Sequence, residues 1–448
     1  MDLEALPDEL LLQIFRHLSE KSPDEVLFDF WFIKHMKFRN DDHDEQPYAG
    51  LRAYPFLGQV CKKWNRILAT DQAKAVLWSQ IVIDFGHELV TAIHTPLVWS
   101  NERPNAEEYA IAFQRVSLSS AKVIDFISQR QKSLKSLVLT NSEGFWGDEG
   151  DYLPLSGKHN FNSSHLGFLV GQMRYQLQEL RLFNCNDLLS SDLGLWGVVT
   201  LCPNLRIFAA EGLNFRLPSQ YVSELGNLMK LESLSLVGEE HIHASTNSWI
   251  VGLDKMPEAW SRLCSLSKLE LRGHHLLDMV PTWLPALPAL RHLDLSLNAS
   301  INLQNLSSFD KLETLVLQSL DLSQPAGAEQ ISLLAKRFLP NLEGLSGSLK
   351  SISLAGNRFT SLPEMLMKLG SLNTLDFNGN KELQILGPLT GFLASWPGIQ
   401  VLDFRGVHKD KNSAYWSDAK CTTMKFVAAA AKLLKRRKYH SRVLIDRD

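Results

Sequence analysis

The chain has 448 residues, 45% of them hydrophobic and 21% charged, which is enough apolar material for a large core. Its formal net charge of −3 at pH 7 gives no general attraction to nucleic acid or to an anionic membrane. The 5 cysteines are scattered without a Cys-x-x-Cys pair, which favours a reducing compartment. The acidic N-terminus does not fit a signal peptide and no uncharged run could span a bilayer, so we expect a cytoplasmic or nuclear protein.

The first predicted element is a helix that begins near Pro7. Proline is tolerated at the first helical position because its missing amide is one of the unpaired donors there. Asp8 and Glu9 suit the positive end of the helix dipole. A second helical stretch covers 56–68 and leads to Leu77-Trp78. In the first helix, apolar residues recur at helical spacing, at Leu10, Leu11, Ile14, Phe15 and Leu18.

These two helical segments resemble the F-box, a small helical module. The first reads Leu-Pro-Asp-Glu-Leu-Leu-Leu-Gln-Ile-Phe over 6–15, and the second contains Val-Cys-Lys-Lys-Trp over 60–64. The resemblance implies a module that docks onto the small adaptor subunit of an SCF-type cullin–RING ubiquitin ligase while another domain holds the substrate. The positions that match the family's adaptor-binding and core-forming residues are Leu6, Pro7, Leu10, Ile14, Phe15, Leu18, Val60, Cys61 and Trp64. A purely internal role in the helix core is the alternative for each.

An insertion at about 22–54 lengthens the usual connection between the two helical segments. Such an insertion costs little stability because the entropy of loop closure grows slowly with length, but it could obstruct the adaptor. Its charged run at 41–45 lacks the residue spacing of a calcium loop, which favours a solvated loop. We therefore expect neither a metal ion nor a cofactor.

The rest of the chain repeats the pattern Leu-x-x-Leu-x-Leu. Most copies are separated by the roughly 20 to 29 residues typical of a leucine-rich repeat. Further copies are expected at 78–83 and 113–118, and a last strand at 442–445. The clear copies begin at Leu134, Leu177, Leu205, Leu231, Leu266, Leu290, Leu312, Leu349, Leu372 and Ile399.

This spacing has a direct structural meaning, because alternate side chains of a strand face the same way. The fourth and sixth positions of each copy should point into a common core, which single copies can form only by stacking. We predict an α/β chain: a small all-helical module over 1–80, then a leucine-rich-repeat solenoid of roughly 10 to 13 repeats over 81–448, with a parallel concave sheet. The ninth positions Asn298, Asn357 and Asn380 should hydrogen-bond the backbone where the chain leaves its strand, and Cys185 takes that place in its own copy.

The positions between the core leucines should face outward on the concave side. Mixed charges with an aromatic anchor would form a recognition stripe for a protein substrate. An ordinary solvated sheet surface is the alternative, and the insertions after Leu139, Leu236 and Leu317 are rival sites. His274 and His275 are interpreted as isolated surface residues. The candidate substrate-binding residues are Glu179, Arg181, Phe183, Lys268, Glu270, Arg272, His292, Asp294, Asp376, Asp403 and Arg405.

The C-terminal region, about 418–448, is expected to cap the array with a helix over 426–438, whose basic end at 435–438 could also serve in nuclear import. The usual nucleotide-binding, hydrolase and zinc-protease motifs do not occur in the sequence. The leading hypothesis is a non-catalytic substrate receptor of an SCF-type ligase, a monomer within the complex that contacts the adaptor, through it cullin, and a protein substrate. A repeat scaffold or inhibitor without ligase assembly is the alternative, followed by a receptor whose concave face is completed by a small molecule.

Overall fold

The fold is described in a computed structural model of the chain, which divides into two compact units, 1–205 and 206–448. The predicted adaptor-binding residues, the insertion at 22–54 and the helix at 426–438 all lie outside the described residues, so what was expected of them stays a prediction. The residues that the structure describes are 80–84, 124, 127–128, 132, 134–140, 144–146, 152–154, 162–189, 192–213, 217, 219–238, 252–274, 277–298, 301–323, 337–383, 394–407 and 442–444.

The first unit contains a parallel sheet of three strands, with β2 (Ser136–Thr140) between β1 (Gln80–Asp84) and β5 (Glu179–Phe183). The strand expected at 78–83 is therefore present. The described part of this unit includes the helices α8 (Ser163–Gln172), α9 (Asn186–Leu189) and α10 (Asp192–Leu201), and α8 and α10 pack against each other. A separate antiparallel hairpin consists of β3 (Gly144–Trp146) and β4 (Tyr152–Pro154).

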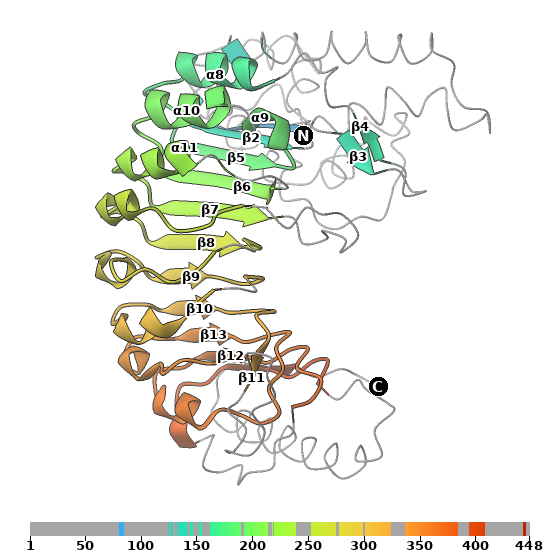
Figure 1. Ribbon diagram of the computed structural model, residues 1–448, viewed down its shortest axis with the longest axis vertical. Coiled ribbons are helices and arrows are strands. Elements are labelled where there is room, and N and C mark those ends of the chain that lie inside the picture. The colour runs from blue at the N-terminus through green and yellow to red at the C-terminus, as the bar shows by residue number, and fades with distance from the viewer. Residues whose placement is uncertain are drawn as a thin grey trace, which may run out of the picture. The chain divides into compact units, whose positions relative to one another are not determined.

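The second unit is built on one parallel sheet, whose strands lie side by side (Figure 1). The separate strands β11 (Leu322–Ser323) and β12 (Arg337–Phe338) form a short parallel pair. The strands of the main sheet follow in chain order: β6 (Ile207–Leu213), β7 (Ser233–Gly238), β8 (Lys268–Arg272), β9 (His292–Asp294), β10 (Thr314–Val316), β13 (Ser351–Ser353), β14 (Thr374–Asp376), β15 (Val401–Asp403) and β16 (Arg442–Leu444).

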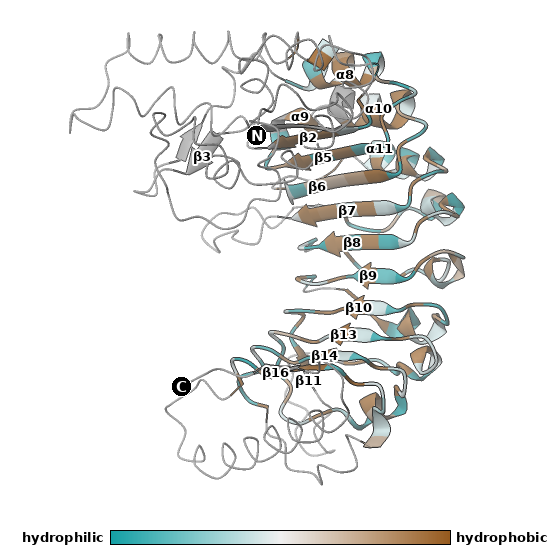
Figure 2. Cartoon of the chain, turned by 180° about the vertical axis from the view of Figure 1, so that it is seen from behind, coloured by the Kyte–Doolittle hydropathy of each residue, from teal (hydrophilic) through white to brown (hydrophobic). Residues whose placement is uncertain are grey.

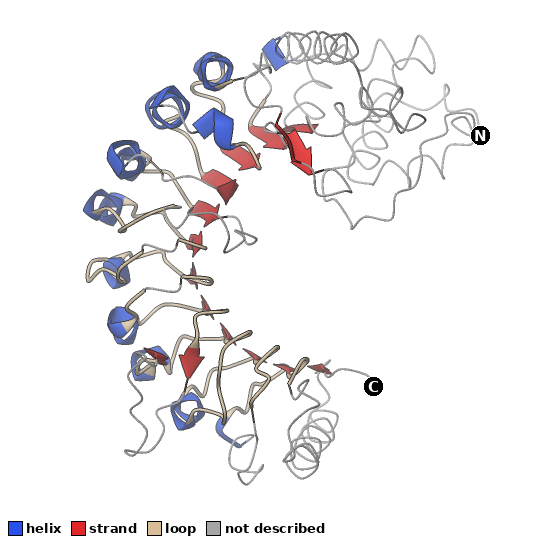
Figure 3. Cartoon of the chain, turned by 45° about the vertical axis from the view of Figure 1, so that its right-hand side comes forward, coloured by secondary structure: helices blue, strands red, loops and turns tan. Residues whose placement is uncertain are grey.

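Short helical segments carry the chain back between these strands. Figure 3 shows them on the side of the second unit opposite to its strands. The return segments are α11 (Ser219–Glu224), η4 (Leu225–Asn227), η5 (Glu258–Arg262), η6 (Leu284–Ala286), η7 (Gln304–Ser308), η8 (Glu343–Leu345) and η9 (Glu364–Lys368).

The core lies between the strands and the return segments. The first, fourth and sixth positions of every copy from Leu134 to Ile399 are at most 3% exposed. Equivalent positions pair across strands, as in Leu234 with Leu269 and Leu269 with Leu293. Burying one leucine contributes about 1.5–3 kcal/mol, so stacking of the copies stabilises the array. The predicted leucine-rich-repeat solenoid is therefore confirmed.

The asparagines at the ninth position make the predicted backbone hydrogen bonds. Asn298 Nδ2 donates to the carbonyl oxygens of Leu271 at 2.6 Å and Leu295 at 2.7 Å. Asn357 and Asn380 make equivalent bonds to the carbonyl oxygens at the ends of their own strands and the preceding ones. These buried amides join each copy to the one before it.

The interpretation of His274 as a surface residue is wrong, because this side chain is fully buried. His274 stands at the ninth position of the copy that begins at Leu266, where other copies have asparagine. Its Nδ1 accepts the backbone N–H of Leu253 at 3.2 Å, and its Nε2 lies 2.8 Å from the carbonyl oxygen of Leu236. An Nδ1 that accepts leaves the proton on Nε2, so neutral His274 donates to Leu236 and acts as an extended asparagine.

Candidate functional site

The predicted substrate-binding residues of the first unit lie on β5. Glu179, Arg181 and Phe183 alternate with the buried Leu180 and Leu182 and are partly exposed, as the alternation predicts. Arg181 Nε forms an ion pair with Glu179 Oε1. The aromatic ring of Phe183 thus stands at the end of a strand whose two charges are already paired with each other.

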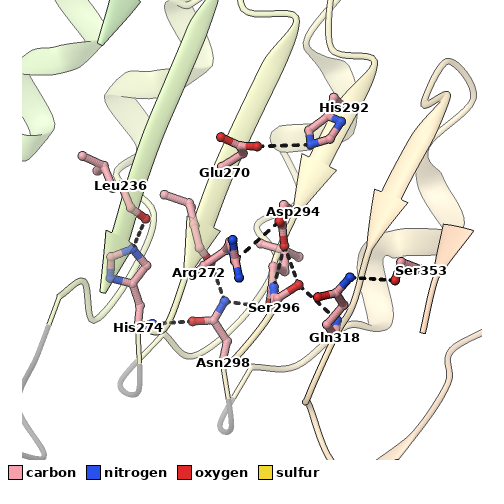
Figure 4. Close-up of polar contacts among 12 residues, drawn as sticks. Leu236, Glu270, Arg272, His274, His292, Asp294, Ser296, Asn298, Gln318 and Ser353 are labelled. Carbon is pink, nitrogen blue, oxygen red and sulfur yellow. Dashed lines mark hydrogen bonds and ion pairs between the residues drawn. The ribbon is translucent and has the colours of Figure 1, made fainter. Parts of the chain in front are cut away.

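In the second unit, Glu270 is the centre of a polar cluster on β8 and β9 (Figure 4). Lys268 Nζ lies 2.8 Å from Glu270 Oε1, along the same strand. His292 Nε2, on the neighbouring strand, lies 3.6 Å from the same oxygen. The strand register therefore brings three of the predicted residues together.

A second cluster surrounds Asp294. Arg272 Nε lies 3.8 Å from Asp294 Oδ2, and Asp294 Oδ1 accepts the hydroxyl of Ser296 at 2.6 Å and its backbone N–H at 2.9 Å. Asp294 was expected on a solvated surface, but it is only 6% exposed. Its partners in the strand register, Glu270 and Val316, flank it on both sides, so a fifth-position side chain can be covered.

Hydrogen bonds extend this cluster across the next strands through residues that the sequence did not single out. Gln318 bridges two neighbouring strands. Its backbone N–H donates to Ser296 Oγ at 3.1 Å, and its side-chain Nε2 donates to Ser353 Oγ at 2.8 Å. The hydroxyl of Ser353 donates to Asp376 Oδ2 at 2.6 Å. Ser296 and Gln318 occupy the seventh position of their copies, which begin at Leu290 and Leu312. This shared position is the sequence signal that could have predicted their contact.

Asp403 and Arg405 form a pair of their own on β15 and just after it. Arg405 Nε lies 3.0 Å and 3.1 Å from the two carboxylate oxygens of Asp403, and its Nη2 lies 2.6 Å from Oδ2. Such a two-pronged contact fixes the orientation of a guanidinium more firmly than a single bond does. The predicted residues of the second unit are therefore distributed over distinct clusters within one sheet.

The two central carboxyl groups have pKa values shifted in opposite directions. Burial raises the pKa of Asp294, and the hydrogen bonds from Ser296 and the charge of Arg272 only partly offset this effect. Burial also acts to raise the pKa of Glu270, but hydrogen bonds from His292 and Lys268 and the charge of Lys268 outweigh it and lower the pKa to about 2. Glu270 is therefore a firmly ionised carboxylate next to one that binds a proton more readily.

In three charged pairs on the strands β8, β9 and β15, the cation is more exposed than its carboxylate. The side chain of Lys268 is 43% exposed and that of Glu270 20%. Arg272 is 32% exposed against 9% for Asp294, and Arg405 is 48% exposed against 8% for Asp403. The formal charges cancel within each pair, but an approaching molecule meets the cationic groups first.

Among the described residues, no group of three or more His, Cys, Asp or Glu side chains is arranged to hold a metal ion. Within the same part of the chain, no helix has the length and apolar character needed to cross a membrane. The candidate site is the charged outer face of the sheet in the second unit, the face that points away from the leucine core, where the clusters around Glu270 and Asp294 lie.

Comparisons with known proteins give structural similarity without close relatives. No family model matches the chain, and no curated protein matches it. Among solved structures, it is similar to the plant peptide hormone receptor RGFR1 in complex with RGF2, with 17% identity and a TM-score of 0.36 over 60% of this chain and 40% of that chain.

Two further solved structures are similar to the chain. The yeast complex of Rad7 and Elc1 matches with 16% identity and a TM-score of 0.43, over 91% of each chain. The internalin inlF of Listeria monocytogenes matches with 15% identity and a TM-score of 0.36, over 66% of this chain and 84% of that chain.

Proposed function

We propose that the chain is the non-catalytic substrate-recognition subunit of an SCF-type E3 ubiquitin ligase. The segment that resembles an F-box binds the adaptor subunit and, through it, cullin, while the repeat array binds a protein substrate. The observation that supports the binding role most directly is the outer sheet face of the second unit, where paired charges are exposed on a fully packed leucine core. Leucine-rich-repeat arrays are protein-interaction folds, and their extended sheet faces serve as binding surfaces.

Such a subunit needs no reacting groups of its own. Its contribution is to hold a substrate lysine near a conjugating enzyme recruited elsewhere in the complex, which converts a bimolecular encounter into a nearly intramolecular one. The charged residues of β8 and β9 fit this role because they are held by each other, by backbone hydrogen bonds and by strand pairing. A rigid surface of this kind loses little conformational entropy when a partner binds.

The test is co-purification of the adaptor subunit with the full chain. The combined variant Leu6→Ala, Pro7→Ala and Ile14→Ala should lose the adaptor, because these positions match the family's contact residues. Gln13→Ala is the matched control, since it changes a polar residue of the same predicted helix outside the apolar stripe, and it should retain the adaptor. Circular dichroism must show that both variants remain folded.

If the unchanged chain does not bind the adaptor, the ligase assignment fails. The protein would then be the alternative, a leucine-rich-repeat scaffold or inhibitor that does not assemble a ligase. If the combined variant binds as well as the unchanged chain, the F-box residues assigned to the contact are wrong.

A further inference from the structure

The exposed charge on β8 is cationic, although the strand carries both signs. Lys268 and Arg272 are the more exposed members of their pairs, and Glu270 and Asp294 are the less exposed ones. Because Lys268 and Arg272 occupy positions four apart on one strand, their Cα atoms are separated by roughly 13 Å at the usual strand rise. Two cationic groups are thus presented along one line of the sheet.

A half-buried carboxylate, Glu270, and a buried one, Asp294, hold these cations in place. Glu270 contacts both Lys268 and His292, and Asp294 is itself fixed by Ser296. An ammonium has three N–H donors and a guanidinium has five, so each can serve a further acceptor beside the carboxylate of its pair. Preorganised donors of this kind form charge-assisted hydrogen bonds with little further loss of side-chain entropy.

The strands near β8 differ in the size of their outward side chains. The outward positions of β7 are Ser233, Ser235 and Val237, whose side chains are short. On the far side of β9, β10 presents Thr314 and Val316. Figure 2 shows hydrophobic residues along both β7 and β8, with hydrophilic ones where β8 begins. On the β7 side, the two cationic side chains adjoin short side chains, whereas His292 of β9 lies beside Lys268. With 43% of Lys268 and 32% of Arg272 exposed, both side chains are accessible to an extended segment.

We propose that the outer face of β8 and β9 binds an acidic segment of the protein partner, with Lys268 and Arg272 contacting its carboxylate or phosphate groups. This inference rests on the proposed function, because it names the chemistry of the substrate that the repeat array recognises. The negative charges of Glu270 and Asp294 partly neutralise Lys268 and Arg272, which limits the non-specific attraction of polyanions. Recognition then depends on an acidic group that reaches Lys268 or Arg272 directly.

The test measures binding of labelled Gly-Ser peptides to the full chain by fluorescence anisotropy. One peptide carries four aspartates, a second four phosphoserines, a third four asparagines and a fourth four lysines. The aspartate or phosphoserine peptide should bind, and the asparagine and lysine peptides should not. Binding of the phosphoserine peptide alone would assign phosphate as the recognised group, whereas equal binding of both acidic peptides would show that carboxylates suffice.

The double variant Lys268→Gln/Arg272→Gln should weaken binding of the acidic peptide by roughly tenfold, because both charge-assisted contacts are lost. The matched control is Arg206→Gln/Lys350→Gln, which removes two exposed positive charges that pair with Glu232 and Glu313 just before their strands. That control should change binding of the acidic peptide less than about twofold, because Arg206 and Lys350 do not contact the peptide and salt screens their charges from it. Equal losses in both variants would overturn the inference.

A variant that binds the acidic peptide more tightly than the unchanged chain cannot owe this change to misfolding. Glu270→Gln removes the charge that partly neutralises Lys268 but keeps an amide oxygen that can accept from its ammonium, so the side chain stays positioned. This variant should tighten binding of the aspartate peptide by about twofold to fivefold, because the cation is no longer neutralised. Unchanged or weaker binding by this variant, while its circular dichroism spectrum matches that of the unchanged chain, would contradict the proposal. Absence of peptide binding in a chain that still co-purifies with the adaptor would overturn this inference and leave the ligase assignment intact.

Discussion

Strands β7 and β8 of the second unit have equivalent cores and different outer faces. They pair in parallel over Ser233–Val237 and Lys268–Arg272, and the leucines at their fourth and sixth positions are buried alike. The outward positions are serines and valine on β7, but lysine, glutamate and arginine on β8. Two strands with the same backbone conformation and equivalent core residues therefore have different outer faces. The leucines determine the fold, and the residues between them can vary without changing it.

The largest expected effect tests the equivalence of the two cores. Leu234→Ala on β7 and Leu269→Ala on β8 should each lower the free energy of unfolding by about 2–5 kcal/mol, because each removes a fully buried leucine side chain and leaves a cavity. Urea unfolding followed by circular dichroism measures both. A loss below about 1 kcal/mol in either variant would show that its copy is not part of one close-packed core.

The core could be predicted from the sequence because the alternation of leucines along a strand directly reports which side chains are buried. The same alternation placed Lys268, Glu270 and Arg272 correctly on the outer face. It could not show that Asp294 and Asp403 are nearly inaccessible, since burial of a fifth-position side chain depends on the residues of neighbouring strands. His274 was misread for a related reason: its partners, Leu236 and Leu253, are distant in the sequence.

The next effect concerns the charged face of β8 and its dependence on pH. The pKa of Glu270 in the folded chain is about 2, below the ordinary value of 4.5. The contacts of its carboxylate therefore stabilise the fold fully above pH 4.5, and this stabilisation is lost as the pH falls toward 2. Compared with Glu270→Gln, the unchanged chain should gain up to about 3 kcal/mol between those limits as pH rises. Urea unfolding at a series of pH values measures the difference.

Asp294→Asn is the control of opposite sign. The pKa of Asp294 is raised above 3.8 in the folded chain, so the folded state binds the proton more tightly and its stability falls as pH rises through that range. Relative to Asp294→Asn, the unchanged chain should therefore lose stability with rising pH. Slopes of the same sign for the two variants would contradict the opposite pKa shifts.

The smallest effect tests the turn after β8, where His274 does what asparagine does in the copy of β9. His274→Ala should cost about 1–3 kcal/mol, because the N–H of Leu253 and the carbonyl of Leu236 lose their buried partner. His274→Asn should recover part of that loss only if the shorter amide reaches the Leu236 carbonyl, as Asn298 reaches that of Leu271.

The backbone around His274 makes incomplete recovery the expected result. Gly252 has a φ of +85°, and a Cβ at this position would collide with the imidazole of His274, so the segment before β8 is shaped around that ring. An asparagine would still accept or donate locally, but it would leave part of the space of the imidazole empty. Equal stability of His274→Asn and the unchanged chain in urea would show instead that the two side chains are interchangeable at this turn.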